Sequence, residues 1–262
     1  MIVCVDGTGP SDSNVYNTQF RHSFVNRIKN TSNHSDRIYH RGPGEDPLDG
    51  VFSIFGGRNQ VSPSFVTNEI SRLWRRLSDE QSRLPSMAFF RTRRVSLSPV
   101  DAPQYNILEE RKKIFLTGYS RGGATVIDVA RLLERQGLQV EAMFLFDAVA
   151  RSFVLEGGAI PNNVRICYHA MRNPITSSRE SFGNCGTRAI RPRGLIPAHF
   201  LTTHGGMGGV PWGASGVPGS GVATINEGFT DQSTTVTPAV EAAGMRRVES
   251  WMWPHLRSHG VV

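Results

Sequence analysis

The sequence predicts an α/β fold, in which helices cover both faces of a mostly parallel central sheet. Short apolar runs alternate along the chain with amphipathic segments, and this alternation is typical of parallel strands that are buried on both faces. Glycine, proline or aspartate follows several of the apolar runs, which marks their ends as turns. The chain has 262 residues, 39% of them hydrophobic, which is enough for one sizeable core. We therefore expect residues 1–262 to form a single domain.

The first half of the chain predicts strands that alternate with covering helices. Residues 1–6 form an apolar run that stops at DGTGP, and the short run RIYH at 37–40 stops at a segment rich in glycine and proline. Apolar side chains recur at helical spacing over 17–30 and over 62–79, and the second of these segments begins with Ser-Pro, which suits a helix N-terminus. Residues 86–98 are strand-like and are followed by prolines, which close the run.

The second half of the chain predicts the rest of the sheet. Residues 114–119 form an apolar run that reads as a strand, and residues 121–137 follow as an amphipathic helix that stops at Gly137. Three further apolar runs predict strands that lie beside it in the sheet. They are at 140–149, 164–171 and 199–204.

A stretch rich in glycine and proline separates the last predicted strand from the last predicted helix. Residues 204–221 contain too much glycine and proline for a regular element, and a loop of this length in a compact domain is usually functional. Together with Trp212, it is a candidate lid or substrate rim. The last helix begins after Thr237, has Pro238 in its first turn, and is expected to end near Pro254.

The charge of the chain predicts little about its partners. The formal net charge is +7 and the isoelectric point is near 9.8, which favours anionic partners such as a membrane surface that is contacted transiently. The basic residues are scattered, however: the runs at 91–94 and 109–113 are short, and no nucleic-acid motif accompanies them. We therefore expect a solvated basic surface and no nucleic-acid partner. The sequence has no heptad repeat, and it therefore does not predict an oligomeric state.

Cysteine usage and the N-terminus predict a soluble protein without a cofactor. Two of the three cysteines, Cys4 and Cys167, lie in apolar runs, where cysteine behaves as a small hydrophobic residue, and nothing in the spacing of Cys4, Cys167 and Cys185 suggests a disulfide framework or a metal site. No run of 18 or more apolar residues is present, and Asp6 falls where a secretory signal would be apolar. We expect a protein that is cytoplasmic as synthesised; signal-independent secretion would leave no trace in composition.

Ser120 lies at the centre of the sequence GYSRGG and is the candidate nucleophile. Glycine at 118 and 122 permits the close backbone approach at a corner where a strand turns sharply into a helix, and the serine at the apex then points outward. The apolar strand before it and the amphipathic helix after it are the context that this G-x-S-x-G elbow requires. The alternative is a simple helix N-cap, since serine is a preferred cap residue.

A serine nucleophile needs an acid that orients its base, and Asp147 is the candidate. The apolar strand after the elbow ends in this residue, and parallel strands present their carboxyl ends at one edge of the sheet. A carboxylate in such an apolar setting needs a hydrogen-bond partner, which an imidazolium would supply. Asp231, in the late loop, is the alternative acid.

The base is expected after Asp147, because the order serine, acid, histidine is typical of this arrangement of strands. His204 is favoured, since it ends a predicted strand and opens a glycine-rich segment in which a substrate could approach the ring. His255 and His259 are the alternatives. His40 and His169, which both precede His204, lie within predicted strands and are interpreted as satisfied core residues.

The reaction also needs two N–H donors for the oxyanion that develops in the transition state. One is the backbone N–H of Arg121, directly after the nucleophile. The second is expected from the loop after the first strand, through Gly7 or Thr8, with Asp6 as the anchor of that loop.

Five motifs in this order resemble a bacterial α/β-hydrolase family that includes type VI secretion phospholipase effectors. They are VDGTG, YHRGPG, GYSRGG, LFDAV and HGGMGG, and they span residues 1 to about 210. Members of this family typically have D-G-T near the N-terminus, P-G-x-G, G-F-S-R-G-A, W-D-T at a strand end and H-x-D-x-G-G. The resemblance implies an α/β-hydrolase-like fold, with Ser120 as nucleophile, Asp147 as acid and His204 as base.

Three positions depart from the motifs of that family. Tyr119 stands where phenylalanine is usual, Gly123 stands where alanine is usual, and Gly206 replaces the acid expected two residues after the histidine. The chain is also short compared with the phospholipase members, which carry additional membrane-binding modules.

The sequence therefore predicts a serine hydrolase of carboxylic esters, with lipid or phospholipid as the expected substrate class. The first alternative is a catalytically silent interaction domain of the same fold, because fold alone does not establish activity. The second is a phosphatase that uses the DGTG loop. Its usual first aspartate is replaced by Cys4, so the expected phosphoryl acceptor is missing.

Overall fold

The centre of the protein is a six-stranded sheet in which every strand is parallel to its neighbours. The computed structural model describes residues 1–10, 12–42, 44–45, 61–84, 101–150, 158–180, 182–211, 224–227 and 234–262. The strand order is β3-β1-β5-β6-β7-β8. The predicted α/β fold is confirmed, and its parallel sheet with helices around it is consistent with an α/β-hydrolase-like architecture. The strands are β1 (Ile2–Val5), β3 (Arg37–His40), β5 (Phe115–Tyr119), β6 (Ala142–Phe146), β7 (Cys167–Arg172) and β8 (Leu195–Phe200).

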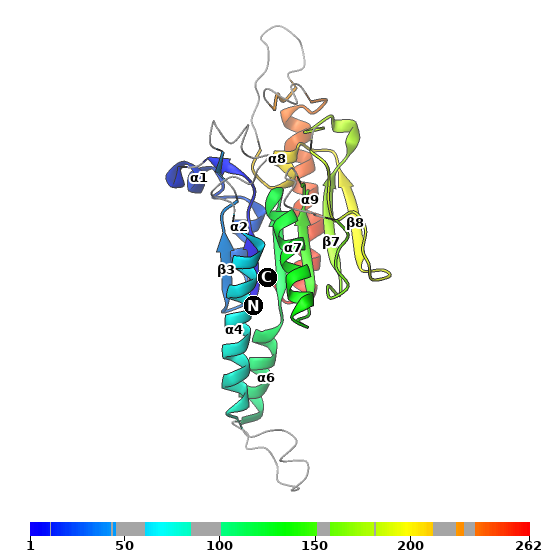
Figure 1. Cartoon of the computed structure of the whole chain (residues 1–262). Helices are drawn as coiled ribbons and strands as arrows, with labels where there is room; N and C mark the ends of the chain where they lie inside the picture. Colours follow the sequence, from blue (N-terminus) through cyan, green and yellow to red (C-terminus); the bar gives the residue numbers. More distant parts are fainter. Residues whose placement is uncertain are drawn as a thin grey trace.

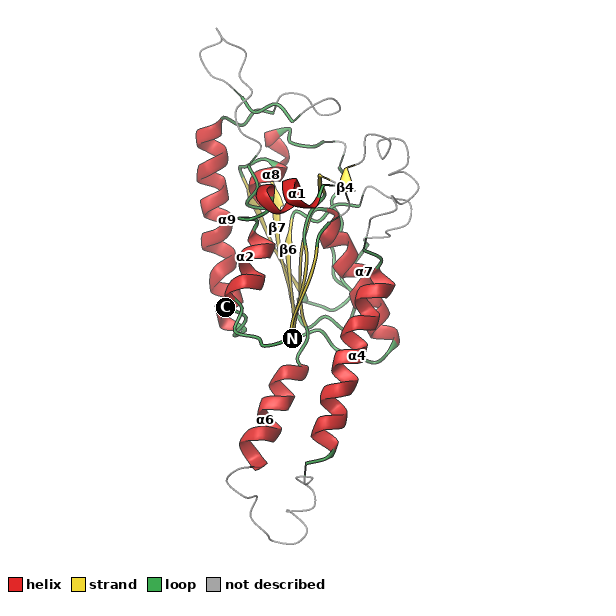
Figure 2. Ribbon diagram, turned by 90° about the vertical axis from the view of Figure 1, so that its left-hand side faces the viewer, coloured by secondary structure: helices red, strands yellow, loops and turns green. Residues whose placement is uncertain are grey.

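Helices pack on both faces of the sheet, as the sequence predicted. Figure 2 shows the sheet edge-on, with helices α2 (Phe24–Thr31) and α9 (Pro238–Ser258) on one side and helices α4 (Pro63–Ser82) and α7 (Arg121–Arg135) on the other. Each face has its own buried cluster of apolar side chains. The central strands β5 and β6 are buried along their whole length, which explains why their sequences are continuous apolar runs.

Helix α4 and helix α6 (Asp101–Lys112) lie side by side and extend past the amino ends of the strands (Figure 1). The sequence did not predict α6. Gln81 of α4 donates a hydrogen bond to Glu109 of α6, and Lys112 donates one back to Gln81. Leu108 is buried in the apolar cluster on the face of the sheet that α4 and α7 cover. Contacts with α4 therefore stabilise a helix whose own sequence has little amphipathic pattern.

The helix predicted at 17–30 is confirmed only from Phe24 onward, because two helices occupy this region. Helix α1 spans Ser13–Gln19 and α2 begins only at Phe24. Ser23 separates them: its hydroxyl donates a hydrogen bond to Asp6 and accepts one from the backbone N–H of Asn26, which caps α2. A residue in that role has extended backbone and cannot lie inside a helix.

Three boundaries near the C-terminus also differ from the prediction. The last strand is at 195–200 instead of 199–204, and His204 starts the four-residue helix α8 (His204–Met207) in a stretch where no regular element was expected. Helix α9 passes through Pro254 and ends at Ser258. The buried side chains Met252 and Leu256 hold the last turn of α9 against the sheet despite the proline.

Some predictions fall outside the described residues, namely the strand at 86–98, the part of the glycine-rich segment from 212 to 221 with Trp212, and Asp231. Among the described helices, none combines the length and apolar character needed to cross a lipid bilayer. All three cysteines are buried and free.

The chain path places a topological switch point at the carboxyl ends of the central strands. From β1 the chain moves outward to β3 at the edge, and it later returns to place β5 on the opposite side of β1. The loops that follow β1 and β5 therefore leave the sheet toward opposite sides. Ligands bind at such a switch point in open α/β sheets. Residues 6–8 follow β1 and Ser120 follows β5, so both lie at this point.

Candidate active site

Ser120, His204 and Asp147 form a continuous row of hydrogen bonds, as the sequence predicted. The Oγ of Ser120 lies 2.9 Å from Nε2 of His204, and Nδ1 of His204 lies 2.6 Å from Oδ2 of Asp147. A carboxylate only accepts, so Nδ1–H donates to Asp147 and Nε2 is left to accept the hydrogen of the serine hydroxyl. All three side chains are buried.

The backbone at Ser120 is strained in the way that the elbow motif requires. Its φ is 56° and its ψ is −130°, a conformation that residues with a Cβ rarely adopt. Its hydroxyl makes no capping bond to helix α7, so the N-cap alternative does not describe its side chain. A Cβ on Gly118 would come within 2.6 Å of the carbonyl oxygen of Gly122. The serine therefore points away from its helix and toward His204.

Replacing Gly122 by alanine is expected to lower the free energy of unfolding by about 3 kcal/mol. A Cβ there would lie 2.3 Å from the carbonyl oxygen of Val5 and 2.4 Å from that of Asp6, and backbone cannot move aside as a flexible side chain can. Urea unfolding measures the loss. Gly183→Ala is the matched control, because no atom lies within 4 Å of its added Cβ, and its unfolding free energy should stay within about 0.5 kcal/mol of wild type. Equal stabilities for the two variants would contradict the tight corner.

Asp147 is an ionised acid that is held by four donors. Besides His204, it accepts hydrogen bonds from Nη1 of Arg172 at 2.6 Å, from the backbone N–H of Arg172 at 3.3 Å and from Nδ2 of Asn184 at 2.9 Å. Burial alone would raise the pKa of this carboxyl. The hydrogen bond from His204 and the positive charge of Arg172 outweigh burial and hold its pKa well below the usual range.

The backbone of His204 is fixed from both sides. Its N–H donates to Oγ of Ser178 at 2.7 Å, and its carbonyl oxygen accepts from the Tyr119 hydroxyl at 2.9 Å. The hydroxyl of Tyr119 therefore has a structural role at the position where the related motif has phenylalanine. The rings of Tyr119 and Phe182 lie 5.1 Å and 5.3 Å from the imidazole.

Two buried glutamates support the segments next to His204. Glu227 accepts the hydroxyl of Ser178 at 2.7 Å, and Glu241 of α9 accepts the hydroxyl of Thr203. Thr203 in turn caps α8 by accepting the N–H of Gly206. A Cβ on Gly206 would meet the hydroxyl oxygen of Thr202 at 2.1 Å, so the acid of the related motif has no room at this position.

The predicted oxyanion donors are placed together, but Gly7 was a wrong choice. Its N–H is already donated to Oδ1 of Asp6 at 2.9 Å, which turns it away from a substrate. Thr8 is the next residue, and its Oγ1 accepts from Nε of Arg121 at 2.6 Å. The backbone N–H of Arg121 begins helix α7. Arg121 and Thr8 are therefore the remaining pair of candidate donors.

Asp6 anchors the loop after β1, as predicted. Its buried carboxylate accepts from Gly7, from the Ser23 hydroxyl at 2.5 Å and from the Tyr39 hydroxyl at 3.1 Å. Burial raises the pKa of Asp6 to about 6, against the opposing effect of these hydrogen bonds.

The alternative bases His255 and His259 are wrong, because they lie at the other end of the sheet. His255 stacks on Tyr168, and His259 lies 3.2 Å from the Tyr168 hydroxyl and packs near Phe115. Phe115 begins the strand that ends before Ser120, which is about 16 Å away at the rise of a β-strand. His40, which pairs with Glu69 at 2.6 Å, is structural as expected.

The buried ring of His169 should make the free energy of unfolding depend on pH. Its Nδ1–H donates to the carbonyl of Gly186 and its Nε2 accepts from the N–H of Ala148, so the buried ring is held neutral. Burial lowers its pKa to about 4 from 6.5. Between these values the unfolded chain binds more protons than the folded one, so the stabilisation is lost as the pH falls from about 6.5 to 4.

We expect the loss of unfolding free energy between pH 7 and pH 5 to be about 2 kcal/mol smaller in His169→Gln than in wild type. The comparison isolates His169 from His34, whose pKa is also lowered to about 4 by burial and which acts in the same direction. It also isolates the ring from Asp6, whose raised pKa acts in the opposite direction. Urea unfolding at the two pH values measures the difference, and equal losses would contradict the neutral buried ring.

Sequence reasoning missed Arg172, Asn184 and Ser178. Arg172 ends strand β7, beside the strand that ends in Asp147, so its place at the same edge was a usable signal. Asn184 and Ser178 lie in the loop after β7 and carried no comparable signal. The described residues include no group of three or more histidine, cysteine or acidic side chains that could hold a metal ion.

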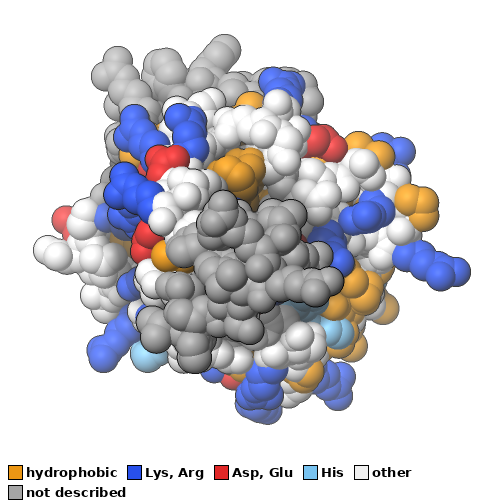
Figure 3. Space-filling model, turned by 90° about the horizontal axis from the view of Figure 1, so that it is seen from below, with side chains coloured by type: hydrophobic (Ala, Val, Ile, Leu, Met, Phe, Trp, Pro, Cys, Tyr) orange, Lys and Arg blue, Asp and Glu red, His pale blue; other side chains and the backbone are white. Residues whose placement is uncertain are grey.

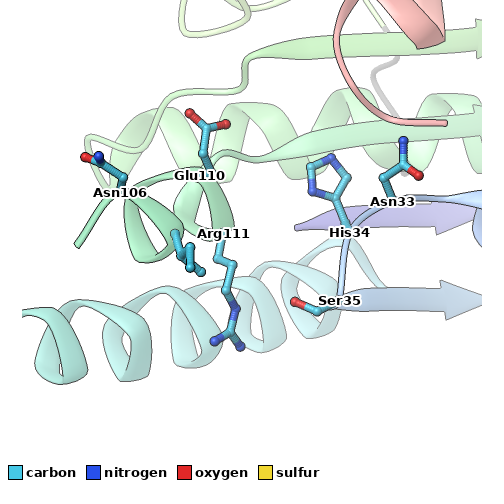
Figure 4. Close-up of a pocket in the computed structure, with 7 residues that line it drawn as sticks. Asn33, His34, Ser35, Asn106, Glu110 and Arg111 are labelled. Atoms are coloured by element: carbon cyan, nitrogen blue, oxygen red, sulfur yellow. The ribbon is translucent and has the colours of Figure 1, made fainter. Parts of the chain in front are cut away.

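A hollow elsewhere in the described part of the chain lacks the paired nucleophile, base and acid of the row. This hollow of about 390 Å³ lies at the amino ends of the strands (Figure 4), but its charged members are engaged elsewhere: Arg111 pairs with Asp36 and Glu110 pairs with Lys113. Figure 3 shows this end of the molecule, where basic side chains occur at separate places, some beside acidic ones. The hollow is lined by Asn33, His34, Ser35, Asn106, Ile107, Glu110 and Arg111.

Comparisons with known proteins add little to this geometry. No family model and no curated protein matches the chain. Among solved structures, an uncharacterized protein from Pseudomonas aeruginosa is similar with a TM-score of 0.40 and 14% sequence identity, over 79% of this chain and 41% of that one. This chain thus spans less than half the length of that protein. The functional argument therefore rests on the site itself.

Proposed function

We propose that this protein is a serine hydrolase that cleaves carboxylic esters through an acyl-enzyme. The observation that carries the proposal is the row from Ser120 through His204 to Asp147, with contacts of 2.9 and 2.6 Å, behind a serine held at a φ of 56°. A nucleophile, a base and an acid that orients the base are the requirements for activating a hydroxyl group.

In the proposed reaction, Oγ of Ser120 attacks the ester carbonyl carbon while Nε2 of His204 takes its proton. The carbonyl oxygen becomes an oxyanion, which accepts hydrogen bonds from the backbone N–H groups of Arg121 and Thr8; each such donor is typically worth about 3 kcal/mol. The C–O bond then breaks, and the leaving alcohol takes the proton from His204. Water repeats the sequence on the acyl-enzyme and releases the acid. Asp147 stays ionised and holds the Nδ1–H throughout.

Exposed apolar side chains at the carboxyl edge of the sheet, the edge at which the row lies, favour an apolar ester such as a lipid. Ile175, Leu201 and Val240 are 69%, 43% and 41% exposed. Ile175 follows the end of β7, Leu201 follows the end of β8, and Val240 lies in the first turn of α9, which meets this edge through Glu241 and Thr202. Exposed apolar side chains beside a site are suited to an apolar substrate or to the surface that presents it.

Ile175→Asp is expected to reduce hydrolysis of a long-chain ester in anionic vesicles several-fold, and to leave hydrolysis of a soluble short-chain ester unchanged. The new charge opposes contact with the vesicle surface without touching the row. Ile107→Asp is the matched control, because Ile107 is 58% exposed on α6 at the other end of the molecule. Equal losses with Ile107→Asp, or equal losses on both substrates, would contradict a rim specific for lipid.

The two alternatives have less support. A phosphatase that used the DGTG loop would present Asp6 to its substrate, but this carboxylate has no exposed surface and accepts three hydrogen bonds from the protein. A silent interaction domain would have no need for a strained serine aimed at a histidine.

A fluorophosphonate probe tests the proposal directly. Wild type should be labelled at Ser120, as located by peptide mass spectrometry, and Ser120→Ala should not be labelled. His204→Ala should label far more slowly, whereas His255→Ala and His259→Ala should label at the wild-type rate. A folded wild-type chain that the probe does not label would favour the silent interaction domain.

A further inference from the structure

Arg172 is a buried cation that contacts the same carboxylate oxygen of Asp147 as the histidine does. Its Nη1 lies 2.6 Å from Oδ2 of Asp147, the same oxygen that accepts from His204. The arginine residue is only 7% exposed and Asp147 is fully buried. A triad of the usual kind needs no such cation, because the acid has only to orient the base and to stabilise the imidazolium.

The other nitrogens of the Arg172 guanidinium bind the segment 178–182, which contacts His204. Nε donates to the carbonyl oxygen of Ser178 at 2.8 Å, and Nη2 donates to those of Arg179 at 3.0 Å and Phe182 at 2.7 Å. Ser178 is the residue whose hydroxyl accepts the N–H of His204, and the ring of Phe182 packs edge-on against the imidazole. One planar side chain thus fixes the acid and the support of the base together, which a lysine could not do with its single ammonium group.

We propose that Arg172 is a positioning residue for the proposed hydrolysis, which aligns Asp147 with His204 and sets the lower limit of the pH range in which the row is active. The inference rests on the proposed function. Arg172 acts through two separable properties of its side chain. One is the fork of N–H donors that fixes the geometry, and the other is the positive charge beside Asp147.

The positive charge of Arg172 matters because His204 should carry its second proton, the one on Nε2, only while the transition state forms. Asp147 stabilises the doubly protonated ring. A guanidinium on the same carboxylate oxygen reduces the attraction that Asp147 exerts on that proton. Removing the positive charge therefore makes the ring easier to protonate. Since a protonated ring cannot accept the serine proton, activity should then begin at higher pH.

Several other charged or titratable groups surround the row, and they are the background against which Arg172 acts. Tyr119 comes from β5 and His169 from β7, and burial places their pKa values on opposite sides of the physiological range, well above 10 and at about 4. Neither changes charge between pH 5 and 8. Further charged groups near the row, among the described residues, are Asp6 after β1, Arg121 at the start of α7, Arg179 after β7, Glu227, which accepts from Ser178, and Glu241 of α9.

Two variants separate charge from geometry. In Arg172→Met, kcat should fall about tenfold, KM should stay unchanged, and the acid limb of the kcat/KM profile should move up by about one pH unit. In Arg172→Lys, which keeps the charge but loses the fork, kcat should fall while the acid limb stays in place. The matched control is Arg111→Met, which removes an arginine–carboxylate pair with Asp36 at the far end of the molecule and should leave the profile unchanged.

A double-mutant cycle tests whether Arg172 acts through Asp147. Arg172→Met should slow phosphonate labelling in wild type but should have no further effect in Asp147→Asn. Where Arg172→Met alone leaves an unpaired carboxylate and does not fold, the test rests on Arg172→Lys, which keeps the charge beside Asp147. An acid limb that does not move in Arg172→Met, wild-type kcat in Arg172→Lys, or full additivity in the cycle would overturn the proposal.

A readout without substrate separates this inference from the proposed function. The proton in the His204–Asp147 hydrogen bond should give a downfield NMR resonance, and its titration midpoint should move to higher pH in Arg172→Met but not in Arg111→Met. If the wild-type chain neither labels nor hydrolyses esters, but the midpoint still moves in Arg172→Met, the hydrolase is refuted and the role of Arg172 is retained. Hydrolysis together with an unshifted midpoint would do the reverse.

Discussion

Ser120→Ala is expected to lower kcat for ester hydrolysis by about 10⁴- to 10⁶-fold, with little change in the free energy of unfolding. The hydroxyl supplies the atom that forms the acyl-enzyme, and no neighbouring group in the row can replace it. Steady-state hydrolysis of a chromogenic ester measures the loss. Stability should hardly change, because the variant removes one hydroxyl group and keeps the backbone of the elbow.

The control for this variant is Ser82→Ala, which removes an exposed serine hydroxyl from the last turn of α4. It should hydrolyse the ester at the wild-type rate. Ser120→Ala that retains substantial activity would show that the reaction uses another nucleophile, and the proposed function would then fail for this site.

His204→Ala is the second variant for which we expect a very large loss, about 10⁴-fold or more in kcat. Among the described residues, Nε2 of His204 is the hydrogen-bond partner of the Ser120 hydroxyl, at 2.9 Å, so the variant loses the group that takes the serine proton. His255→Ala and His259→Ala should keep wild-type kcat, because their rings contact Tyr168 at the other end of the sheet. The three variants are measured side by side with the same ester. A loss in His255→Ala or His259→Ala as large as in His204→Ala would contradict the assignment of the base.

Much of the fold could be predicted from the sequence, because its signals are local. The buried strands are continuous apolar runs, and serine or threonine followed by proline marks the starts of α4 and α9, where Ser62 and Thr237 do cap the helices. Helix α6 was missed because its own pattern is weak and its partners lie on α4. The break before α2 was missed because it depends on a bond between Ser23 and Asp6, 17 residues apart.

The row itself was predictable for a related reason. Ser120 and Asp147 directly follow strands that are parallel and adjacent in the sheet, so both lie at its carboxyl edge. His204 was chosen over two other histidines from its glycine-rich neighbours, although it starts a helix instead of ending a strand. Arg172 was not predictable in its role, since an arginine at a strand end is usually solvated. Its burial follows from Asp147 and from three carbonyl groups that only the folded chain brings together.

Helix α9, which supports one side of the site, follows all three residues of the row along the chain. Ser120, Asp147 and His204 all precede it, so they leave the ribosome before the helix does. Yet Glu241, which holds Thr203 beside the histidine, and the side chains that cover one face of the sheet, among them Met252 and Leu256, belong to α9. A nascent chain therefore contains every reacting group, together with Tyr119 and Ser178 that hold the backbone of His204, before it contains Glu241 and the apolar side chains that cover this face of the sheet.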